Sequence, residues 1–429
     1  MNSNEIYVSL DIGTSNVKVI IGEMANGSLN ILGVGSAPSE GIKKGSIVDI
    51  DETVRSIKKA VENAERMVGI TIRSVIVGVN GNHVQLQPCH GVVAVSNEDR
   101  EIGDLDVARV IDAAQVLSIP PEREIIDVIP GQFIVDGLDG ITDPRGMIGV
   151  RLEMEGTIIT GSKTILHNLL RCVEKAGLEI ADICLQPLAS GSIALSKDEK
   201  NLGVALVDIG AGSMTISIFE EGALQATSVL PIGGDHLTKD ISIGFRTTTE
   251  EAEQVKIKHG HAFIDLASEE ETFSVSTIGS SSDQEFNQFE LAHIIEPRLE
   301  EMLELMTEEL QRLGVRDLPG GFVLTGGVAG MDGVLELARD VLSQSVRVAI
   351  PDYIGVREPQ YTTGVGLIQF TYKNVKVQGK EVAAAVYEDE FEESRPKRKQ
   401  KTAAEQDDRR EKSTGMKQKV KSFFNLFVE

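Results

Sequence analysis

The feature that most constrains this chain is a pattern that occurs twice: an apolar run ending in aspartate, a turn of small residues, and a second apolar run. The first copy is VSLDIGTSNVKVII at residues 8–21, with Asp11 at the end of its first run. The second copy is GVALVDIGAGSMTISIF at residues 203–219, with Asp208 in the same place. Each copy predicts two strands of a hairpin. Two copies predict a duplicated fold, and the alternative is two unrelated hairpins.

The turn residues favour an anion as the ligand of these hairpins. Small side chains let backbone N–H groups crowd around a bulky anion, as they do in phosphate loops. A carboxylate beside such a loop repels phosphate unless a cation lies between them. We therefore predict that Asp11 lies on the magnesium side of a phosphate site and binds the ion directly or through water.

Composition and missing motifs exclude several classes of protein. The chain has 429 residues, enough for two to four domains, and its net charge of −24 argues against duplex nucleic acid as a ligand. Three cysteines, Cys89, Cys172 and Cys184, lack metal-site spacing and fit a reduced, cytosolic protein. No signal peptide and no apolar run of about 20 residues are found. The motifs of P-loop NTPases, zincins and α/β-hydrolases are also missing.

Residues 81–161 differ in character from what precedes them and predict a module inserted into the first half. We expect strands at 84–86, 91–95, 124–135 and 151–159, a helix near 105–117 and a loop at 136–149. The alternative is that this segment is simply more of the same domain. Further along, an acidic helix is expected at 289–313, interrupted or started at Pro297.

Three groups of residues have two interpretations each. Gln186 lies where the halves join, and it either positions a water or only hydrogen-bonds the hinge. Glu253 and Lys256 lie three residues apart on a predicted helix, where they form a surface ion pair or contact the sugar and base of a nucleotide. Gly326 and Gly327 follow a buried strand and either let the backbone approach a ligand or form a plain turn.

Five motifs in a fixed order carry a family resemblance. They are DIGTSNVK at 11–18, QPLASG at 186–191, DIGAGS at 208–213, GGD at 233–235 and LTGGVA at 324–329. This order resembles the superfamily of actin, DnaK-type chaperones and sugar kinases over about residues 5–370. The insert, TEEAEQVK at 249–256 and the C-terminal tail look like the FtsA family of bacterial division actins. The resemblance implies a duplicated actin-like (ribonuclease-H-like) α/β ATPase fold with an inserted subdomain IC.

The resemblance also implies a division of the chain into parts. Subdomain IA is expected at 1–82, 162–196 and 352–378, IC at 83–161, IIA at 197–234 and 306–351, and IIB at 235–305. Opposite charge blocks with few apolar residues predict a disordered linker at 379–411.

Carried over position by position, the resemblance implies Mg²⁺ and ATP as cofactors. Asp11 and Asp208 are expected to hold hydrated magnesium, Asp208 and Gln186 to act in catalysis, and Gln186 to orient the attacking water. The expected nucleotide-binding residues are Gly13, Thr14, Ser15, Asn16, Lys18, Gly210, Ala211, Gly212, Ser213, Gly233, Gly234, Glu253, Lys256, Gly326 and Gly327. Members of the family differ in how well they hydrolyse ATP, so the resemblance leaves turnover open and allows a weak Mg-dependent ATPase.

The last segment, KSTGMKQKVKSFFNLFVE at 412–429, predicts an amphipathic membrane-targeting helix. Five side chains share one arc of the helical wheel and two lysines border it: Met416, Val420, Phe423, Phe424 and Phe427, with Lys417 and Lys419. Such a pattern is typical of an interfacial anchor on an anionic membrane surface. The alternative is a terminal helix that docks on the protein's own body.

The family resemblance implies an ATP-binding cell-division protein at the septum, on the cytoplasmic face of the membrane. It would anchor the FtsZ ring through subdomain IIB, polymerise with itself into filaments and recruit later division proteins through IC. The alternatives from the sequence are a small-molecule kinase of the sugar-kinase branch and a PilM-like assembly-platform protein. No nucleic acid partner is expected.

Overall fold

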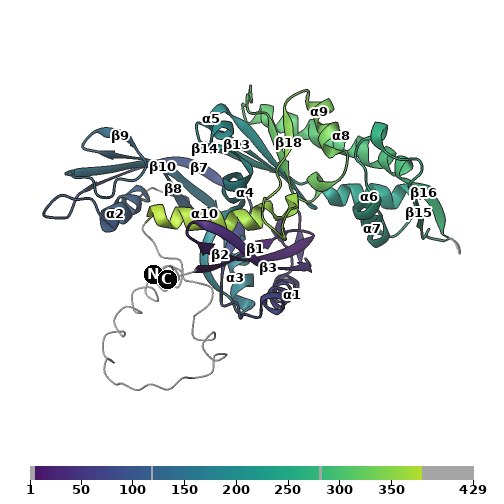
Figure 1. Cartoon of the computed structure of the whole chain (residues 1–429), viewed down its shortest axis with the longest axis horizontal. Helices are drawn as coiled ribbons and strands as arrows, with labels where there is room; N and C mark the ends of the chain where they lie inside the picture. Colours follow the sequence, from purple (N-terminus) through teal and green to yellow (C-terminus); the bar gives the residue numbers. More distant parts are fainter. Residues whose placement is uncertain (1–4, 117–118, 280–282, 379–429) are drawn as a thin grey trace, which may run out of the picture. The chain divides into compact units, whose positions relative to one another are not determined.

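The computed structural model describes residues 5–116, 119–279 and 283–378 (Figure 1). The predicted linker and the predicted membrane-targeting helix therefore lie outside the described residues. Among the helices of the described part, none is long and apolar enough to cross a membrane.

Two five-stranded sheets with the same strand order form the centre of the two halves. The first has the order β11-β6-β1-β2-β3, and the second, read in the same direction, has the order β18-β17-β12-β13-β14. In each sheet, three antiparallel strands that follow one another in the chain adjoin two parallel strands. The bounds are β1 Glu5–Ile12, β2 Asn16–Ala25, β3 Ser28–Pro38, β6 Ser74–Val79, β11 Glu179–Leu185, β12 Val204–Ile209, β13 Met214–Glu220, β14 Ala223–Leu230, β17 Phe322–Thr325 and β18 Val346–Val348. The predicted duplication is confirmed.

The two Asp-bearing hairpins have the same register. Asp11 pairs with Lys18 across β1 and β2, and Asp208 pairs with Thr215 across β12 and β13. The turns close alike, because Gly13 N donates to Asn16 O at 3.1 Å and Gly210 N donates to Ser213 O at 3.0 Å. Each turn therefore places its aspartate at the same point of its sheet.

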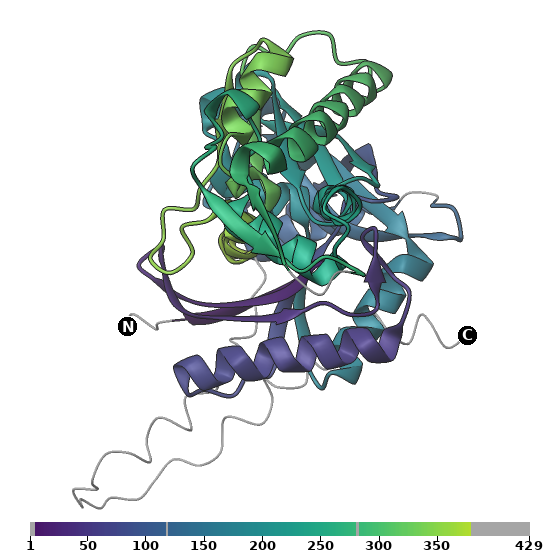
Figure 2. The ribbon, with the colours of Figure 1, turned by 90° about the vertical axis from the view of Figure 1, so that its right-hand side faces the viewer.

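Alternating side chains of the first sheet build two cores. Val8, Leu10 and their neighbours pack against α1 (Ile50–Val68) and α3 (Lys163–Lys175), whereas Tyr7 and Ile20 pack against α4 (Gln186–Ala194) and α10 (Thr362–Gln378). Figure 2 shows α1 running along the strands of this sheet. Asp49 caps its first turn by accepting from Glu52 N, and Gly69 ends it in the left-handed conformation.

The second half contains the longest helix of the described residues, α8 (Gln288–Arg312). The sheet of this half shares a core with α6 (Gly234–Gly244), α7 (Thr249–His259), α8 and α9 (Val334–Leu342). Short elements complete this half: α5 (Lys197–Leu202) and the hairpin of β15 (Thr272–Val275) and β16 (Gln284–Asn287). The expected interruption at Pro297 is wrong, since α8 runs through it. Ile295 and Leu299, buried on either side, anchor the helix across the missing backbone donor.

The segment after β6 forms a sheet of its own with a separate core. The order is β7-β10-β8-β9, with α2 (Asp104–Ala114) packed against it. The bounds are β7 Gln85–Ala94, β8 Arg123–Val135, β9 Leu138–Ile141 and β10 Arg151–Ser162. Two expectations were wrong: strands 84–86 and 91–95 are one strand, and loop 136–149 contains β9. Pro88 is tolerated inside β7 because β7 is an edge strand.

Helix α10 touches both the first sheet and the inserted sheet. Gly366 lies against the backbone of α4, where an added Cβ would clash with the carbonyl oxygen of Ala189. At the other end, Asn374 Nδ2 and Gln378 Nε2 donate to Asp127 of β8 at 3.1 Å and 3.3 Å. Glycine at position 366 is therefore required for the close contact between α10 and α4, and the two amide side chains hold the other end of α10 to the inserted sheet.

We predict that Gly366→Ala lowers the free energy of unfolding by about 1–3 kcal/mol, because the methyl group meets rigid backbone. The matched control is Gly364→Ala on the same helix, where the new Cβ meets side chains, the end of Ile20 first, and no backbone atom. The control should be neutral or stabilising, since alanine favours helix by about 1 kcal/mol over glycine. Urea unfolding of both variants is the measurement, and equal effects would contradict the prediction.

Candidate functional site

Two carboxylates, one from each central sheet, lie close enough to interact. Asp11 is 9% exposed, and its Oδ1 accepts a hydrogen bond from Gln186 Nε2 at 2.7 Å. Burial raises the pKa of Asp11 above its ordinary value. Burial and the neighbouring charge of Asp11 raise the pKa of Asp208 to about 6. Because each negative charge raises the energy of the other, a divalent cation beside the pair is favourable.

Lys18 brings one positive charge to this acid pair. It lies directly across the hairpin from Asp11, and its charge opposes the effect of burial on the pKa of Asp11 and Asp208. Lys18 Nζ donates to the carbonyl oxygen of Gln360 at 2.8 Å and lies 5.7 Å from the centre of the Tyr361 ring. The second hairpin has Thr215 at the corresponding position, so the cation comes from one copy only.

The turns of the two hairpins touch each other. A Cβ added to Gly212 would lie 2.7 Å from the Thr14 side chain, so glycine is required for this approach. Thr14 Oγ1 also accepts from Gly45 N at 3.3 Å. Within the first turn, Asn16 Nδ2 donates to Ser15 Oγ at 3.1 Å. The predicted phosphate-binding turns are thus brought together.

Gly233 and Gly234 seat the start of α6 on the second turn. Gly234 N donates to Gly210 O at 3.0 Å, and Asp235 N donates to Ala211 O at 2.8 Å. A Cβ added to Gly233 would lie 2.5 Å from both of those carbonyl oxygens. The two glycines therefore have a packing role in addition to the nucleotide contact predicted for them.

Lys256 and Glu253 form the expected ion pair, but Lys256 is not a surface residue. Lys256 is 7% exposed, and its Nζ lies 2.6 Å from Glu253 Oε2. The same ammonium group donates to Thr238 Oγ1 at 2.7 Å and to Gly234 O at 3.1 Å. A buried ammonium group held against the start of α6 places positive charge beside the second turn.

Gly326 and Gly327 lie at the end of β17 next to Asp208. Gly326 has φ 90°, and a Cβ there would overlap Asp208 Oδ1, so only glycine fits. At Gly327 an added Cβ would meet no heavy atom within 4 Å. One glycine thus allows contact with the carboxylate, and the next presents open backbone.

The donor set fits a hydrated magnesium ion bound to a nucleotide phosphate. Magnesium keeps several waters and takes one or two carboxylates plus phosphate oxygens, so it needs no larger cage of protein ligands. Among the described residues, no group of three or more His, Cys, Asp or Glu side chains is placed to hold a metal ion. The backbone of both turns and the nearby Lys18 would face the phosphates. The individual roles stay predictions.

Two hydroxyl residues at this site were missed by the sequence analysis. Thr363 Oγ1 donates to Asp208 Oδ2 at 3.2 Å, and Ser190 Oγ lies 2.9 Å from Thr363 Oγ1. Ser190 follows Gln186 by four residues on a helix, a spacing that places both on one face. That spacing was a signal in the sequence, whereas nothing in the sequence connects Thr363 to Asp208.

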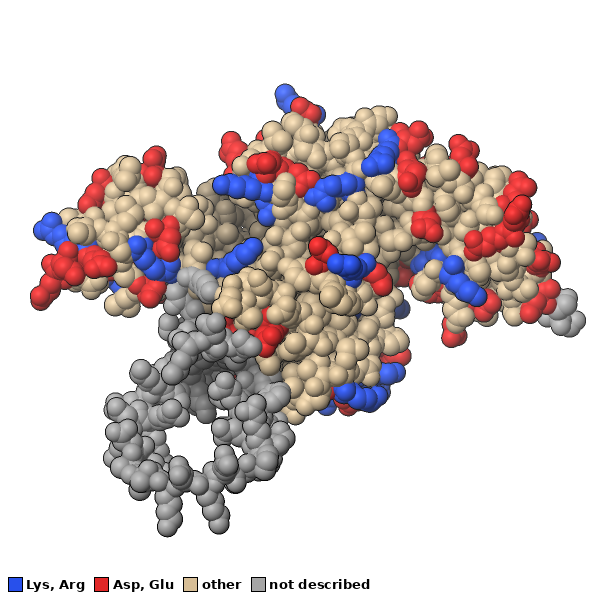
Figure 3. All heavy atoms as spheres, in the orientation of Figure 1, with Lys and Arg blue, Asp and Glu red and all other residues tan. Residues whose placement is uncertain are grey.

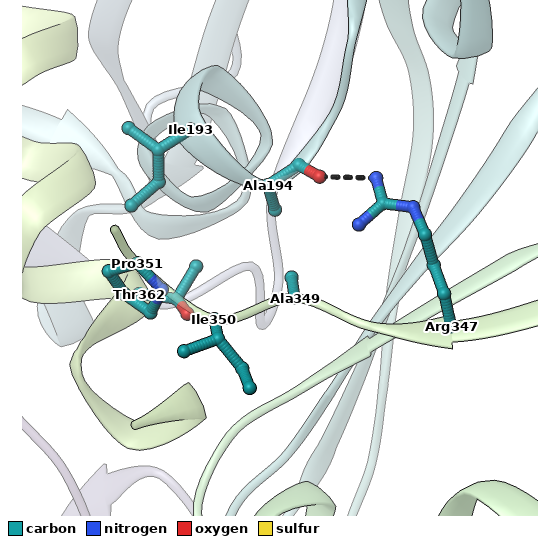
Figure 4. A pocket seen from close by; sticks show the side chains of 7 residues that line it. All are labelled: Ile193, Ala194, Arg347, Ala349, Ile350, Pro351 and Thr362. Carbon is teal, nitrogen blue, oxygen red and sulfur yellow. Dashed lines mark hydrogen bonds between the residues drawn. The ribbon is translucent and has the colours of Figure 1, made fainter. Parts of the chain in front are cut away.

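A separate cavity of about 60 Å³ lies beside the end of α4 (Figure 4). None of the predicted site residues lines it, and its volume suits a few water molecules rather than a nucleotide. Arg347 Nη2 donates to the carbonyl oxygen of Ala194 at 2.6 Å across it. The lining residues are Ile193, Ala194, Arg347, Ala349, Ile350, Pro351 and Thr362.

Comparison with solved structures supports an actin-like fold. The PilM–PilN type IV pilus biogenesis complex has a chain that matches with a TM-score of 0.57 at 17% identity, over 84% of this chain and 97% of that one. MreB5 of Spiroplasma citri, in a structure bound to ADP, matches with a TM-score of 0.53 at 13% identity, over 87% and 97%. At these identities the likeness concerns the fold alone.

Comparison with families and relatives is more specific. A family model described as cell division protein FtsA matches residues 205–366, and one described as the SHS2 domain inserted in FtsA matches residues 81–160. Cell division protein FtsA of Bacillus subtilis is 61% identical over the full length of both chains. With this identity, the two family matches and the actin-like fold, the chain belongs to the FtsA family of cell division proteins.

Proposed function

We propose that this chain binds Mg-ATP between its two central sheets and anchors the FtsZ ring to the cytoplasmic face of the membrane at the septum. Full-length similarity to a cell division protein supports the role in division. The buried pair Asp11 and Asp208 supports the nucleotide, because two carboxylates held together favour a cation. The full-length identity of 61% to a cell division protein favours this function over the small-molecule kinase and the PilM-like alternative.

The chain's own residues have distinct parts in this proposal. Magnesium, when bound, neutralises phosphate charge next to Asp11 and Asp208. Gln186 uses an amide hydrogen to hold Asp11, and since an amide has a separate carbonyl oxygen, its acceptor stays available to orient a water. Lys18 and the turn backbones bind phosphate oxygens. The nucleotide acts as a switch, because ligand contacts to both halves favour the closed arrangement over an open one.

Attachment to the membrane is assigned to residues 412–429, which lie outside the described residues. Burial of the five apolar side chains of that segment is worth at most about 7–15 kcal/mol before ordering costs. Each lysine next to an anionic leaflet adds about 1 kcal/mol. The combined free energy of apolar burial and electrostatic attraction is large enough for a peripheral membrane anchor.

Protein partners are assigned to the two outer parts of the fold. FtsZ docking is proposed for residues 235–305, where Figure 3 shows acidic side chains gathered over α6, α8 and the β15–β16 hairpin. Within this range, Glu301 and Glu304 of α8 are exposed three residues apart on one face of the helix. Later division proteins are assigned to the inserted sheet, and filaments to self-association of the chain.

We predict that Asp208→Asn weakens ATP binding in Mg²⁺ at least about tenfold, since a carboxylate on the metal is lost. At pH 8 and without nucleotide, the free energy of unfolding of the same variant should exceed that of wild type by up to about 3 kcal/mol. The pKa of Asp208 is about 6 in the folded chain, whereas the ordinary pKa of an aspartate is 3.8. Ionised Asp208 therefore destabilises the folded state above pH 6, and this cost disappears below pH 3.8, where the carboxyl is protonated in both states. The gain should therefore shrink between pH 7 and pH 5.

Titration with a fluorescent ATP analogue and urea unfolding at pH 8, pH 7 and pH 5 are the measurements. Asp112→Asn is the matched control, because Asp112 is exposed on α2 of the inserted sheet. An unchanged nucleotide affinity in Asp208→Asn would count heavily against the site. A stability difference independent of pH would count against the buried acid pair.

We predict that Phe423→Glu with Phe427→Glu abolishes sedimentation with anionic vesicles and the recruitment of FtsZ filaments to them. The reason is that charge on the apolar arc of the predicted helix cannot enter the acyl region. The matched control is Gln418→Glu with Asn425→Glu, which adds the same charge on the opposite face. Undiminished sedimentation of the Phe variant would refute the anchor.

A further inference from the structure

Helix α4 reaches both carboxylates of the candidate site from one face. Gln186 and Ser190 are four residues apart on α4 and point the same way. Gln186 holds Asp11 directly, at 2.7 Å. Ser190 reaches Asp208 through Thr363 of α10, at 2.9 Å and 3.2 Å. Ser190 is 2% exposed and Thr363 is 6% exposed, so water does not compete for these bonds.

The donors and acceptors among Ser190, Thr363 and Asp208 follow from the number of hydrogens that each group carries. An ionised carboxylate only accepts, so the single hydroxyl hydrogen of Thr363 is given to Asp208. Ser190 must then donate to Thr363 Oγ1, because the Thr363 hydrogen is already used. The resulting order, Ser190 to Thr363 to Asp208, strengthens the last bond, since a hydroxyl that accepts a hydrogen bond is a better donor.

We propose that Thr363 and Ser190 are positioning residues that orient the Asp208 carboxylate for magnesium in the Mg-ATP site. This inference rests on the function proposed above. Thr363 fixes Oδ2, while Oδ1 lies against Gly326, where no side chain fits. With one oxygen bonded and the other confined, the carboxylate has a single orientation before the ion arrives, and no ordering cost is left for the binding step.

The chain of hydroxyls also crosses from one half of the fold to the other. Helices α4 and α10 pack on the first central sheet, whereas Asp208 belongs to β12 of the second. A neighbouring contact secures the start of α10, because Thr362 Oγ1 lies 2.8 Å from Thr325 Oγ1 of β17. The orientation of Asp208 therefore depends on both sheets being in place, which links metal binding to the closed arrangement.

The test compares ATP affinity with and without magnesium in three variants of the full chain. Thr363→Val removes the donor and keeps the shape of the side chain, whereas Thr363→Ser keeps the hydroxyl. Ser190→Ala removes only the upstream hydroxyl. Each variant is titrated with a fluorescent ATP analogue in MgCl₂ and in EDTA, and thermal unfolding without nucleotide establishes that it is folded.

We expect Thr363→Val to weaken binding in MgCl₂ about tenfold, because a hydrogen bond to a charged group is lost. Binding in EDTA should change by less than about threefold, and so should binding of Thr363→Ser in both buffers. Ser190→Ala should show a smaller loss, again only in MgCl₂. Should Thr363→Val fail to fold, the magnesium-selective loss in Ser190→Ala decides the question.

Two results would overturn the inference. One is unchanged affinity of Thr363→Val and Ser190→Ala in MgCl₂. The other is an equal loss in MgCl₂ and EDTA, which indicates a structural role that does not involve the metal. A wild-type chain without magnesium-dependent ATP binding would instead overturn the proposed function itself, and that result is visible before any variant is compared.

Discussion

The repulsion between Asp11 and Asp208 is the interaction on which the site depends. Each carboxylate lies one residue before the end of a central strand, and the two sheets bring the carboxylates together where both are buried. The surrounding groups reduce the cost without removing it: an amide from Gln186, a hydroxyl from Thr363 and the charge of Lys18. Two carboxylates buried side by side cost stability, and such a pair is typical of a functional site rather than of a structural core.

The sequence determined this arrangement as far as local chemistry reaches. A hairpin turn fixes the register of its two strands, so the sequence pattern alone places Lys18 opposite Asp11. The bond between Ser190 and Thr363 spans 173 positions, and no periodicity reports on a contact that only tertiary packing creates. The continuity of α8 through Pro297 has the same origin, because buried neighbours outweigh a local preference against helix.

Glycine at this site has two roles that the sequence cannot separate. The family resemblance assigned Gly212, Gly233 and Gly326 to nucleotide binding. In the structure the same residues let one piece of protein approach another: Thr14 at Gly212, the second turn at Gly233 and Asp208 at Gly326. Substitution at these positions therefore changes packing between elements along with any ligand contact. Side chains such as Thr363 and Gln186 are better probes, because a replacement of similar shape removes a polar group without forcing backbone segments apart.

Helix α10 connects this chemistry to the inserted sheet. Thr363 in its first turn donates to Asp208, and Asn374 and Gln378 toward its C-terminal end donate to Asp127 of β8. The helix has 17 residues and is about 25 Å long. Because Gly366 lets α10 pack directly on the backbone of α4, the helix is held along its middle as well as at its two ends. One helix therefore contacts both the Asp208 carboxylate and the inserted sheet.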